Sequence, residues 1–429
     1  MPIVELKTLD GHRLLINTRS QATSIMVNDD LVLNYDPEGR MTGAWVEGRN
    51  YRRSLDNHIM VKQEGPRRGL SYRVRRELEP EEARQFLARA YGRVAEYREE
   101  ARRSCALTTG RASAAEWQAV YDALDRILEC DLPQLEREAE AFHNIYKPIN
   151  ILPPDQYLAL VLQATEGCSY NQCAFCGFYR DRAFRIKSLD EFKQHIRDVR
   201  AFFGQALRVR KAIFLADANA LVIPQAQLLA ILDVINAEFA IEPRGLDRTA
   251  LRAWRAEHPN FFEGVYSFID AFTSRRKTAQ DFHEMAQRGL RRVYIGLESG
   301  DGELLKFMGK PNSPQDVAQL VGQVKAGGVA VGLVILAGAG GDTFAAQHVQ
   351  RTTELVNTLP LDSGDLIYFS ELVDYPGSQY SALAREADIQ PLAIDEIEQQ
   401  IKQLRAGFRF NDKEHTPKIS YYDVREFIY

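Results

Sequence analysis

Three cysteines lie within nine residues near the middle of the chain, and their types and spacing indicate chemistry most directly. Cys168, Cys173 and Cys176 follow a C-x4-C-x2-C spacing, which allows three sulfur atoms to face one centre. Soft thiolate ligands select zinc or iron–sulfur clusters. A structural zinc site needs a fourth ligand, and a cubane cluster held by protein alone needs a fourth cysteine. Since neither lies close by in the sequence, the spacing predicts a metal centre with one open coordination position.

Two other interpretations of the loop stay open from the residues alone. It could be a zinc knuckle with a distant fourth ligand, or the cysteines could be core residues that bind no metal. The other two cysteines, Cys105 and Cys130, are too few for a second cluster, and we expect both to be buried on helix faces. An odd total of five cysteines does not suit the disulfide framework of a secreted protein.

The composition is that of an ordinary globular protein. The 429 residues carry a formal net charge of −5, with 45% hydrophobic and 26% charged residues, which argues against disorder as the main state. A mildly acidic chain is a poor candidate for general nucleic-acid binding. We find no apolar stretch long enough to span a bilayer and no signal-peptide pattern at the N-terminus. We therefore expect a cytoplasmic protein with neither nucleic-acid nor membrane partners.

The elements that must position the cysteines form an alternation of strands and helices. The first strand leads directly into the cysteine loop, and each later strand is followed by a helical pattern. The expected strands cover residues 158–165, 211–220, 264–272, 291–300, 329–341 and 365–373. Nearly continuous apolar strands separated by helices predict a parallel sheet covered by helices. Six units are too few for a closed eight-fold barrel, so an open partial barrel or a doubly wound sheet is expected.

The rest of the chain indicates two further regions. Short strands fill the first sixty residues, and three helical patterns follow from Glu79. We therefore expect an accessory domain over 1–154, a partial barrel over 155–380 and a helix and strand extension over 381–429. The predicted class is α/β: a partial (β/α)6 TIM-type barrel with an N-terminal mixed β-then-α accessory domain. Sites in such folds form at the carboxyl ends of the parallel strands.

The cysteine loop, with aromatic Phe175 before its last cysteine, resembles the cluster loop of the radical S-adenosylmethionine (SAM) superfamily. That loop usually has one residue fewer in the first gap. Other segments resemble the superfamily's motifs in the same order: residues 214–219, 294–300, 304–310, 334–341 and 375–378. The resemblance covers roughly residues 157–380. It is greatest to the branch of oxygen-independent coproporphyrinogen oxidases and Elp3-like barrels.

The resemblance implies a radical SAM enzyme that binds one [4Fe-4S] cluster through Cys168, Cys173 and Cys176. SAM would bind the open iron and be cleaved reductively to methionine and a 5′-deoxyadenosyl radical. This radical would start chemistry on a small or modest-sized organic substrate, and an electron donor such as flavodoxin or ferredoxin would supply the electron. Two alternatives remain: transfer of a 3-amino-3-carboxypropyl group from SAM, or a non-catalytic carrier of haem or a cluster.

The resemblance also implies contacts to SAM. Asp217 and Asn219, where the superfamily has its GGE segment, are candidates to accept hydrogen bonds from the SAM ammonium group. Glu298 could accept hydrogen bonds from the ribose hydroxyls, and Lys310 could bind the carboxylate. Equally, Asp217 could cap a helix, and Lys310 could be an exposed lysine at a helix end.

Weaker candidates complete the expected site. Ser267 and Arg275 are further candidates for the SAM carboxylate. The remaining expected cofactor contacts are Phe175, Ile335 and Leu336 in an apolar adenine slot, and Ser299 beside Glu298. Glu371, Tyr368 and Tyr375 near the sixth strand are candidates for substrate contact. The sequence identifies no catalytic residue and no substrate.

Overall fold

The computed structural model describes residues 3–65, 73–107, 112–374 and 378–429, without the side chains of 104–107. The chain divides into two compact units. The N-terminal unit contains Met1–Ile151, Arg197–Arg210 and Arg425–Tyr429, and the barrel unit contains Leu152–Ile196 and Lys211–Val424. The expected domain boundaries at 154 and 380 stay predictions.

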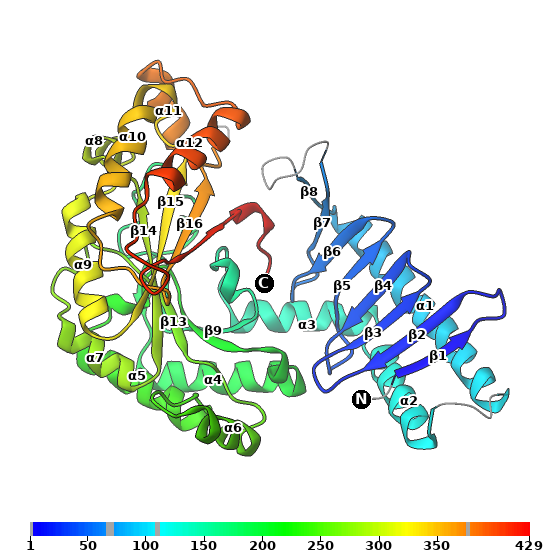
Figure 1. The fold of residues 1–429 in the computed structure, drawn as a ribbon. Helices are drawn as coiled ribbons and strands as arrows, with labels where there is room; N and C mark the ends of the chain where they lie inside the picture. The colour runs from blue at the N-terminus through cyan, green and yellow to red at the C-terminus, as the bar shows by residue number, and fades with distance from the viewer. Residues whose placement is uncertain (1–2, 66–72, 108–111, 375–377) are drawn as a thin grey trace. The chain divides into compact units, whose positions relative to one another are not determined.

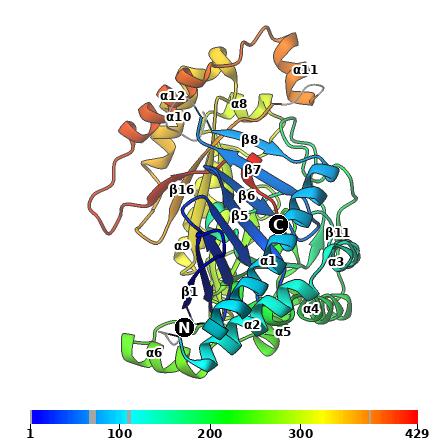
Figure 2. The same ribbon diagram turned by 90° about the vertical axis from the view of Figure 1, so that its right-hand side faces the viewer.

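The N-terminal unit is built on an antiparallel sheet of eight strands in consecutive order. Its strands are β1 (Ile3–Lys7), β2 (Arg13–Thr18), β3 (Thr23–Val27), β4 (Leu31–Tyr35), β5 (Met41–Val46), β6 (Arg49–Arg53), β7 (Ile59–Gln63) and β8 (Val74–Glu77). Three helices follow: α1 (Pro80–Leu107), α2 (Ala114–Glu129) and α3 (Leu132–Ile145). Figures 1 and 2 show α1 and α2 along one face of the sheet. The expected order of strands and then helices is confirmed.

Local sequence explains this unit. Alternate residues of β1 are buried, so one face of the strand packs on the core. That core joins Leu14 and Ile16 of β2 with Val94 of α1 and Leu124 of α2. Ser113 and Glu116 form a capping box that starts α2.

The barrel unit contains a parallel sheet of seven strands, in the order β17-β16-β15-β14-β13-β12-β9. Its strands are β9 (Ala159–Gln163), β12 (Ala212–Ala216), β13 (Val265–Ile269), β14 (Leu290–Glu298), β15 (Ala330–Ala337), β16 (Leu366–Glu371) and β17 (Lys418–Tyr421). Its helices are α4 (Leu189–Phe203), whose residues are divided between the units, α5 (Gln225–Glu238), α6 (Arg248–Glu257), α7 (Ala279–Gln287), α8 (Gly302–Phe307), α9 (Pro314–Ala326), α10 (Gly341–Val356), α11 (Gln379–Glu386) and α12 (Ile394–Gly407). The open α/β barrel is confirmed. β17 lies in the C-terminal extension, for which helix and strand were expected, but its pairing with the barrel sheet was not predicted.

Burial accounts for the parallel sheet. Every residue of β9 and of β12 is buried, as expected for strands covered on both faces. The sheet curves around Asp155, which accepts hydrogen bonds from Tyr294 on β14 (2.5 Å) and Tyr368 on β16 (2.8 Å), although β15 separates these strands. The rings of Phe214 and Phe268 lie 5.0 Å apart, each 6.1 Å from the ring of Tyr294. Aromatic side chains therefore fill this concave face.

In the parts of the chain that the structure describes, every helix is too short or too polar to cross a bilayer.

Candidate metal centre

The cysteine loop begins where β9 ends. Its base is closed by pairing of β10 (Thr165–Glu166) with β11 (Arg185–Ile186). Asp217, directly after β12, ties both ends of the loop: its Oδ2 accepts hydrogen bonds from the backbone N–H of Gly167 (3.0 Å) and from the Arg182 guanidinium (3.3 Å). Gln163 donates to its Oδ1 at 3.1 Å. Both members of the Asp217–Arg182 ion pair are largely buried. The loop that carries the cysteines is thus fixed at both ends by one carboxylate.

Within the loop, backbone and side-chain donors surround the cysteines. The N–H of Asn171 donates to Cys168 Sγ at 3.3 Å, and the N–H of Phe178 donates to the Cys176 sulfur. Arg180 donates to the carbonyl oxygens of Cys173 (2.9 Å) and Cys176 (3.1 Å). Such N–H···S bonds stabilise negative charge on sulfur and tune cluster potentials.

The electrostatics of the three thiols are coupled. Burial raises the pKa of Cys173 to about 12, against the opposing effect of the Lys310 ammonium, and the other two cysteines raise it further. Burial also raises the pKa of Cys176. Metal ligation requires the thiolate form, so the positive charge of bound iron would have to reverse these shifts. Three coupled soft donors on one loop fit a thiolate-ligated iron–sulfur cluster. No group of three or more His, Cys, Asp or Glu side chains among the described residues is arranged to hold a single metal ion.

Glu298 and Lys310 form a charge pair beside the cysteines. Lys310 Nζ lies 2.7 Å from Glu298 Oε1 and also donates to the carbonyl oxygen of Gly296. Both side chains are largely buried, and both act electrostatically on the Cys173 thiol. Glu298, at the carboxyl end of β14, has a φ of +58°, a left-handed conformation that is uncommon outside glycine. The structure therefore brings together the expected cluster ligands and two of the expected SAM contacts.

Helix α10 holds the turn that follows Glu298. The Ser299 hydroxyl lies 2.8 Å from His348 Nδ1 and accepts a hydrogen bond from the N–H of Asp301 at 3.0 Å. Thr352 Oγ1 accepts from the N–H of Gly300 at 2.8 Å. Burial lowers the pKa of His348 to about 4, so its imidazole is neutral near pH 7 and its Nδ1 can accept from Ser299. Ser299, expected beside the cofactor, thus contacts the helix behind the turn.

Asn219 offers a free acceptor at the end of β12. Its Nδ2 donates to Asp270 Oδ2 (2.6 Å) and Thr273 Oγ1 (2.8 Å), which fixes the orientation of the amide. Its Oδ1 is buried and accepts no hydrogen bond within the described part of the chain. A buried acceptor without a donor is costly, so this atom fits a ligand that carries N–H or O–H groups.

An apolar cluster lies next to the loop. It contains Ala174, Leu304, Leu305, Met308, Leu336, Ala339 and Tyr380, with Phe175 packed against it. The Ala174 N–H donates to the carbonyl oxygen of Met308 at 2.9 Å, which joins the loop to α8. Phe175 and Leu336 are thereby brought together. Ile335 precedes Leu336 on β15 and points to the opposite face, so its place in the same slot stays a prediction.

The other expected residues lie in different surroundings. The Ser267 hydroxyl is buried in β13 and donates to the carbonyl oxygen of Leu215 at 2.8 Å. Arg275 pairs with Asp316 at 3.0 Å. Tyr368 donates to Asp155, and Glu371 ends β16. Tyr375 lies outside the described residues, as does most of the segment 375–378.

Sequence reasoning missed three residues that position the site: Arg182, His348 and Tyr170, whose hydroxyl donates to the carbonyl oxygen of Gly309 at 2.9 Å. Each acts on a partner far away in the sequence, and no local pattern marks it. Of the two cysteines assigned to helix faces, Cys130 is buried at the end of α2; the side chain of Cys105, in α1, lies outside the described set.

Comparison with known proteins gives one family. Residues 162–355 match the family model described as Radical SAM superfamily. The chain is 25% identical over 226 residues to 4'-phospho-dehydrooxetanocin synthase of Priestia megaterium, a match that covers 50% of this chain and 28% of the relative. The chain thus spans little more than a quarter of that relative's length.

Two solved structures are similar at low scores. Coproporphyrinogen III oxidase (HemN) from Escherichia coli has a TM-score of 0.39 and 13% identity, covering 63% of this chain and 55% of that one. Elp3 of the archaeon Methanocaldococcus infernus has a TM-score of 0.37 and 12% identity, covering 55% of this chain and 54% of that one.

Proposed function

We propose that this chain, whose residues 162–355 match the radical SAM superfamily model, uses one [4Fe-4S] cluster to cleave SAM reductively and to start radical chemistry on a small or modest-sized organic substrate. The observation that carries this proposal is the position of three coupled cysteines beside the buried Glu298–Lys310 pair, at the carboxyl ends of the parallel strands. This is the edge at which α/β barrels form their sites.

The superfamily uses a [4Fe-4S] cluster and SAM. When bound, the cluster supplies a low-potential electron to SAM. Cys168, Cys173 and Cys176 would hold it, and the N–H groups of Asn171 and Phe178 would favour electron density on their sulfurs. A reductant such as flavodoxin or ferredoxin would deliver the electron.

The chain's polar residues divide the binding of SAM between them. Asn219 Oδ1, a buried acceptor without a donor, would accept from the ammonium group. Lys310 would donate to the carboxylate and Glu298 would accept from the ribose hydroxyls, so SAM would replace part of their mutual ion pair. Asp217 already accepts from three donors, so we assign it to positioning the cysteine loop.

The substrate would bind at the mouth of the barrel. The concave face of the sheet is filled by Phe214, Phe268 and Tyr294, and Asp155 holds Tyr294 and Tyr368 in place. These packed rings favour entry at the carboxyl ends of the strands, beside the cysteine loop.

Anaerobic reconstitution with iron and sulfide, followed by dithionite and SAM, tests the reaction. The expected product is 5′-deoxyadenosine. Methylthioadenosine in its place would indicate transfer of the aminocarboxypropyl group, and absence of both products would refute SAM cleavage. Cys176→Ala should yield neither product, whereas Cys130→Ala, which removes a buried thiol in the N-terminal unit, should retain activity.

A further inference from the structure

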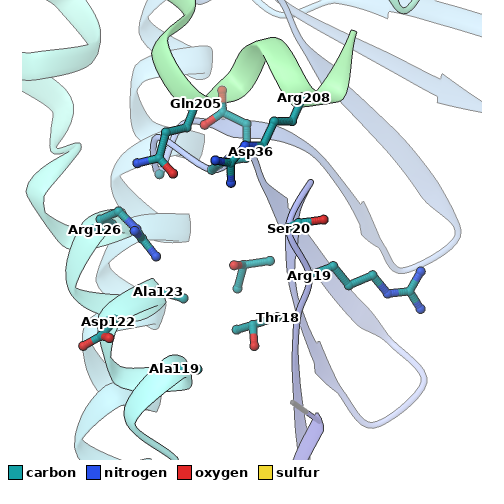
Figure 3. A pocket seen from close by; sticks show the side chains of 13 residues that line it. Thr18, Arg19, Ser20, Asp36, Ala119, Asp122, Ala123, Arg126, Gln205 and Arg208 are labelled. Atoms are coloured by element: carbon teal, nitrogen blue, oxygen red, sulfur yellow. The ribbon is translucent and has the colours of Figure 1, made fainter. Parts of the chain in front are cut away.

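The N-terminal unit contains a cavity of about 410 Å³ (Figure 3). It lies between the end of β2, the turn after β4, helix α2 and the 3-10 helix η2 (Gly204–Val209). Its volume is within the range of roughly 300–1,000 Å³ that is typical of small-molecule sites. None of its lining residues belongs to the candidate metal centre.

Three arginines line this cavity: Arg19, Arg126 and Arg208. All three are exposed, and within the described residues their side chains make no ion pair or hydrogen bond. Figure 3 shows Arg126 on α2 and Arg208 on η2 reaching toward the cavity, whereas the Arg19 side chain, at the end of β2, extends away from it.

The carboxylates at the cavity have other partners. Asp36 accepts hydrogen bonds from the N–H groups of Glu38 (2.9 Å) and Arg40 (3.0 Å), and it pairs with the Arg40 guanidinium. Asp122 accepts from Gln118 at 2.8 Å. Gln118 is neutral, so Asp122 keeps its negative charge. Three arginines against this one carboxylate still leave an excess of positive charge at the cavity, and like charges repel.

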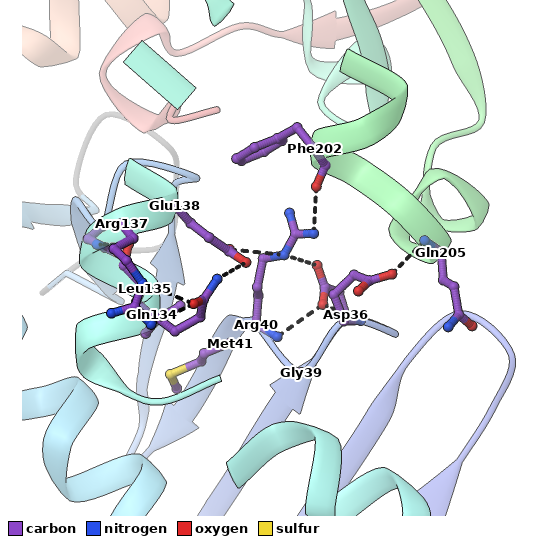
Figure 4. Close-up of polar contacts among 12 residues, drawn as sticks. Asp36, Gly39, Arg40, Met41, Gln134, Leu135, Arg137, Glu138, Phe202 and Gln205 are labelled. Carbon is purple, nitrogen blue, oxygen red and sulfur yellow. Dashed lines mark hydrogen bonds and ion pairs between the residues drawn. The ribbon is translucent and has the colours of Figure 1, made fainter. Parts of the chain in front are cut away.

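The walls that carry these arginines are fixed by a buried network (Figure 4). Arg40, which is 2% exposed, donates to the carbonyl oxygen of Phe202 at 2.8 Å and lies 3.2 Å from Glu138 on α3. Glu38 accepts from the N–H of Gln205 at 2.6 Å, which joins η2 to the turn after β4. The contacts of buried Arg40 are costly to break and hold the end of α4, from which η2 continues. The exposed hydrogen bond between Glu38 and Gln205 adds a direct contact to η2.

The same turn packs directly on α2. Gly39 has a φ of +85°, and a Cβ there would lie 2.4 Å from the carbonyl oxygen of Arg126. Only glycine allows this approach. Both elements that present Arg126 and Arg208 are therefore held against the same turn, and the cavity exists before any ligand binds.

We propose that this cavity binds a small molecule through a phosphate group. Guanidinium groups bind phosphate with paired, charge-assisted hydrogen bonds. A phosphate dianion presents three oxygens, enough for paired donors from Arg126 and Arg208 and for one further donor, whereas a carboxylate presents two. The volume leaves room for an organic group attached to the phosphate.

Isothermal titration calorimetry on the full-length reconstituted protein tests the proposal with three probes: inorganic phosphate, glycerol 3-phosphate and AMP, with acetate as the carboxylate comparison. We expect phosphate compounds to bind and acetate to bind more weakly. If glycerol 3-phosphate or AMP binds more tightly than inorganic phosphate, the ligand is an organic phosphate. If inorganic phosphate binds equally well, the ligand is free phosphate. Both results support a phosphate site.

Arg126→Gln combined with Arg208→Gln should weaken phosphate binding by at least about tenfold, because each loses a charge-assisted hydrogen bond. Arg89→Gln is the matched control: it removes one exposed arginine of the same unit that does not line the cavity, and should bind normally. Circular dichroism confirms that the variants fold. No binding of any phosphate compound, equal binding of acetate, or unchanged affinity in the folded double variant would overturn the proposal.

Discussion

The candidate metal centre and the cavity of the N-terminal unit differ in whether their charged side chains are paired within the protein. At the metal centre, buried charges are paired within the protein: Asp217 with Arg182, and Glu298 with Lys310. Around the N-terminal cavity, Arg126 and Arg208 are exposed and unpaired within the described chain. A buried charge needs a partner within the protein, whereas an exposed charge is stabilised by water and remains available to a ligand. The paired charges should therefore be sensitive points of stability, and the unpaired ones should matter for binding alone.

The largest effect is expected at the pair that holds the cysteine loop. Asp217→Ala removes the buried carboxylate that pairs with the Arg182 guanidinium and leaves the half-exposed Asp181 as a remaining partner. It should cost about 3–5 kcal/mol of unfolding free energy, as measured by denaturant titration. Glu354→Ala, which removes the partner of exposed Arg351, should change stability little. Equal losses in the two variants would show that burial does not distinguish the two kinds of pair.

His348, which contacts the turn after Glu298, should make the unfolding free energy depend on pH. Its folded pKa of about 4 lies below the ordinary value of 6.5, so between pH 4 and 6.5 the unfolded chain binds more protons than the folded one. Stability should then rise with pH across this window and fall by about 3 kcal/mol as pH drops through it.

The measurement is the difference in unfolding free energy between the parent and His348→Gln at several pH values, which cancels the contributions of other groups. The variant should lack this part of the pH dependence. Parallel curves for both proteins would mean that His348 is not held neutral by burial.

Lys310→Gln removes one charge of the second buried pair. We expect SAM binding to weaken about tenfold or more, since a charge-assisted hydrogen bond contributes roughly 1.5–3 kcal/mol. Equilibrium dialysis with labelled SAM measures this. Lys306→Gln, on the short helix α8 that precedes Lys310, is the control and should bind SAM as the parent does, because Lys306 is exposed. Indistinguishable affinities for the two variants would exclude Lys310 from the cofactor site.

The smallest effect on stability is expected at the N-terminal cavity. Arg126→Gln with Arg208→Gln should change the unfolding free energy by no more than about 0.5 kcal/mol, as for exposed residues without partners. Denaturant titration in phosphate-free buffer measures this. A loss of several kcal/mol would show that these arginines support the fold, and the contrast with the metal centre would fail.

Local signals made much of this architecture predictable. Capping boxes mark the starts of α2 and α4. In each, the serine hydroxyl accepts a hydrogen bond from the backbone N–H of the glutamate three residues later, and that glutamate's carboxylate accepts one from the serine N–H. The buried strands could be predicted from the sequence because both of their faces are apolar. The place of β17 in the barrel sheet was not predicted because this strand has four residues, none of them buried.

The site was predictable only in part. The sequence brought Cys173, Glu298 and Lys310 into one expected site, and the structure places them within electrostatic reach of one another. The partnership of Asp217 with Arg182, 35 residues away, depends on how the loop folds back, which no periodicity records. Strand alternation alone could have separated Ile335 from Leu336.

The most direct test of a three-cysteine cluster with one iron open to SAM is electron paramagnetic resonance of the reduced, reconstituted protein before and after SAM is added. We predict a [4Fe-4S] signal that shifts when SAM binds, and loss of this shift in Cys176→Ala. A signal that SAM leaves unchanged in the parent protein, or the same SAM-induced shift in Cys176→Ala, would contradict the assignment of Cys168, Cys173 and Cys176 as its ligands.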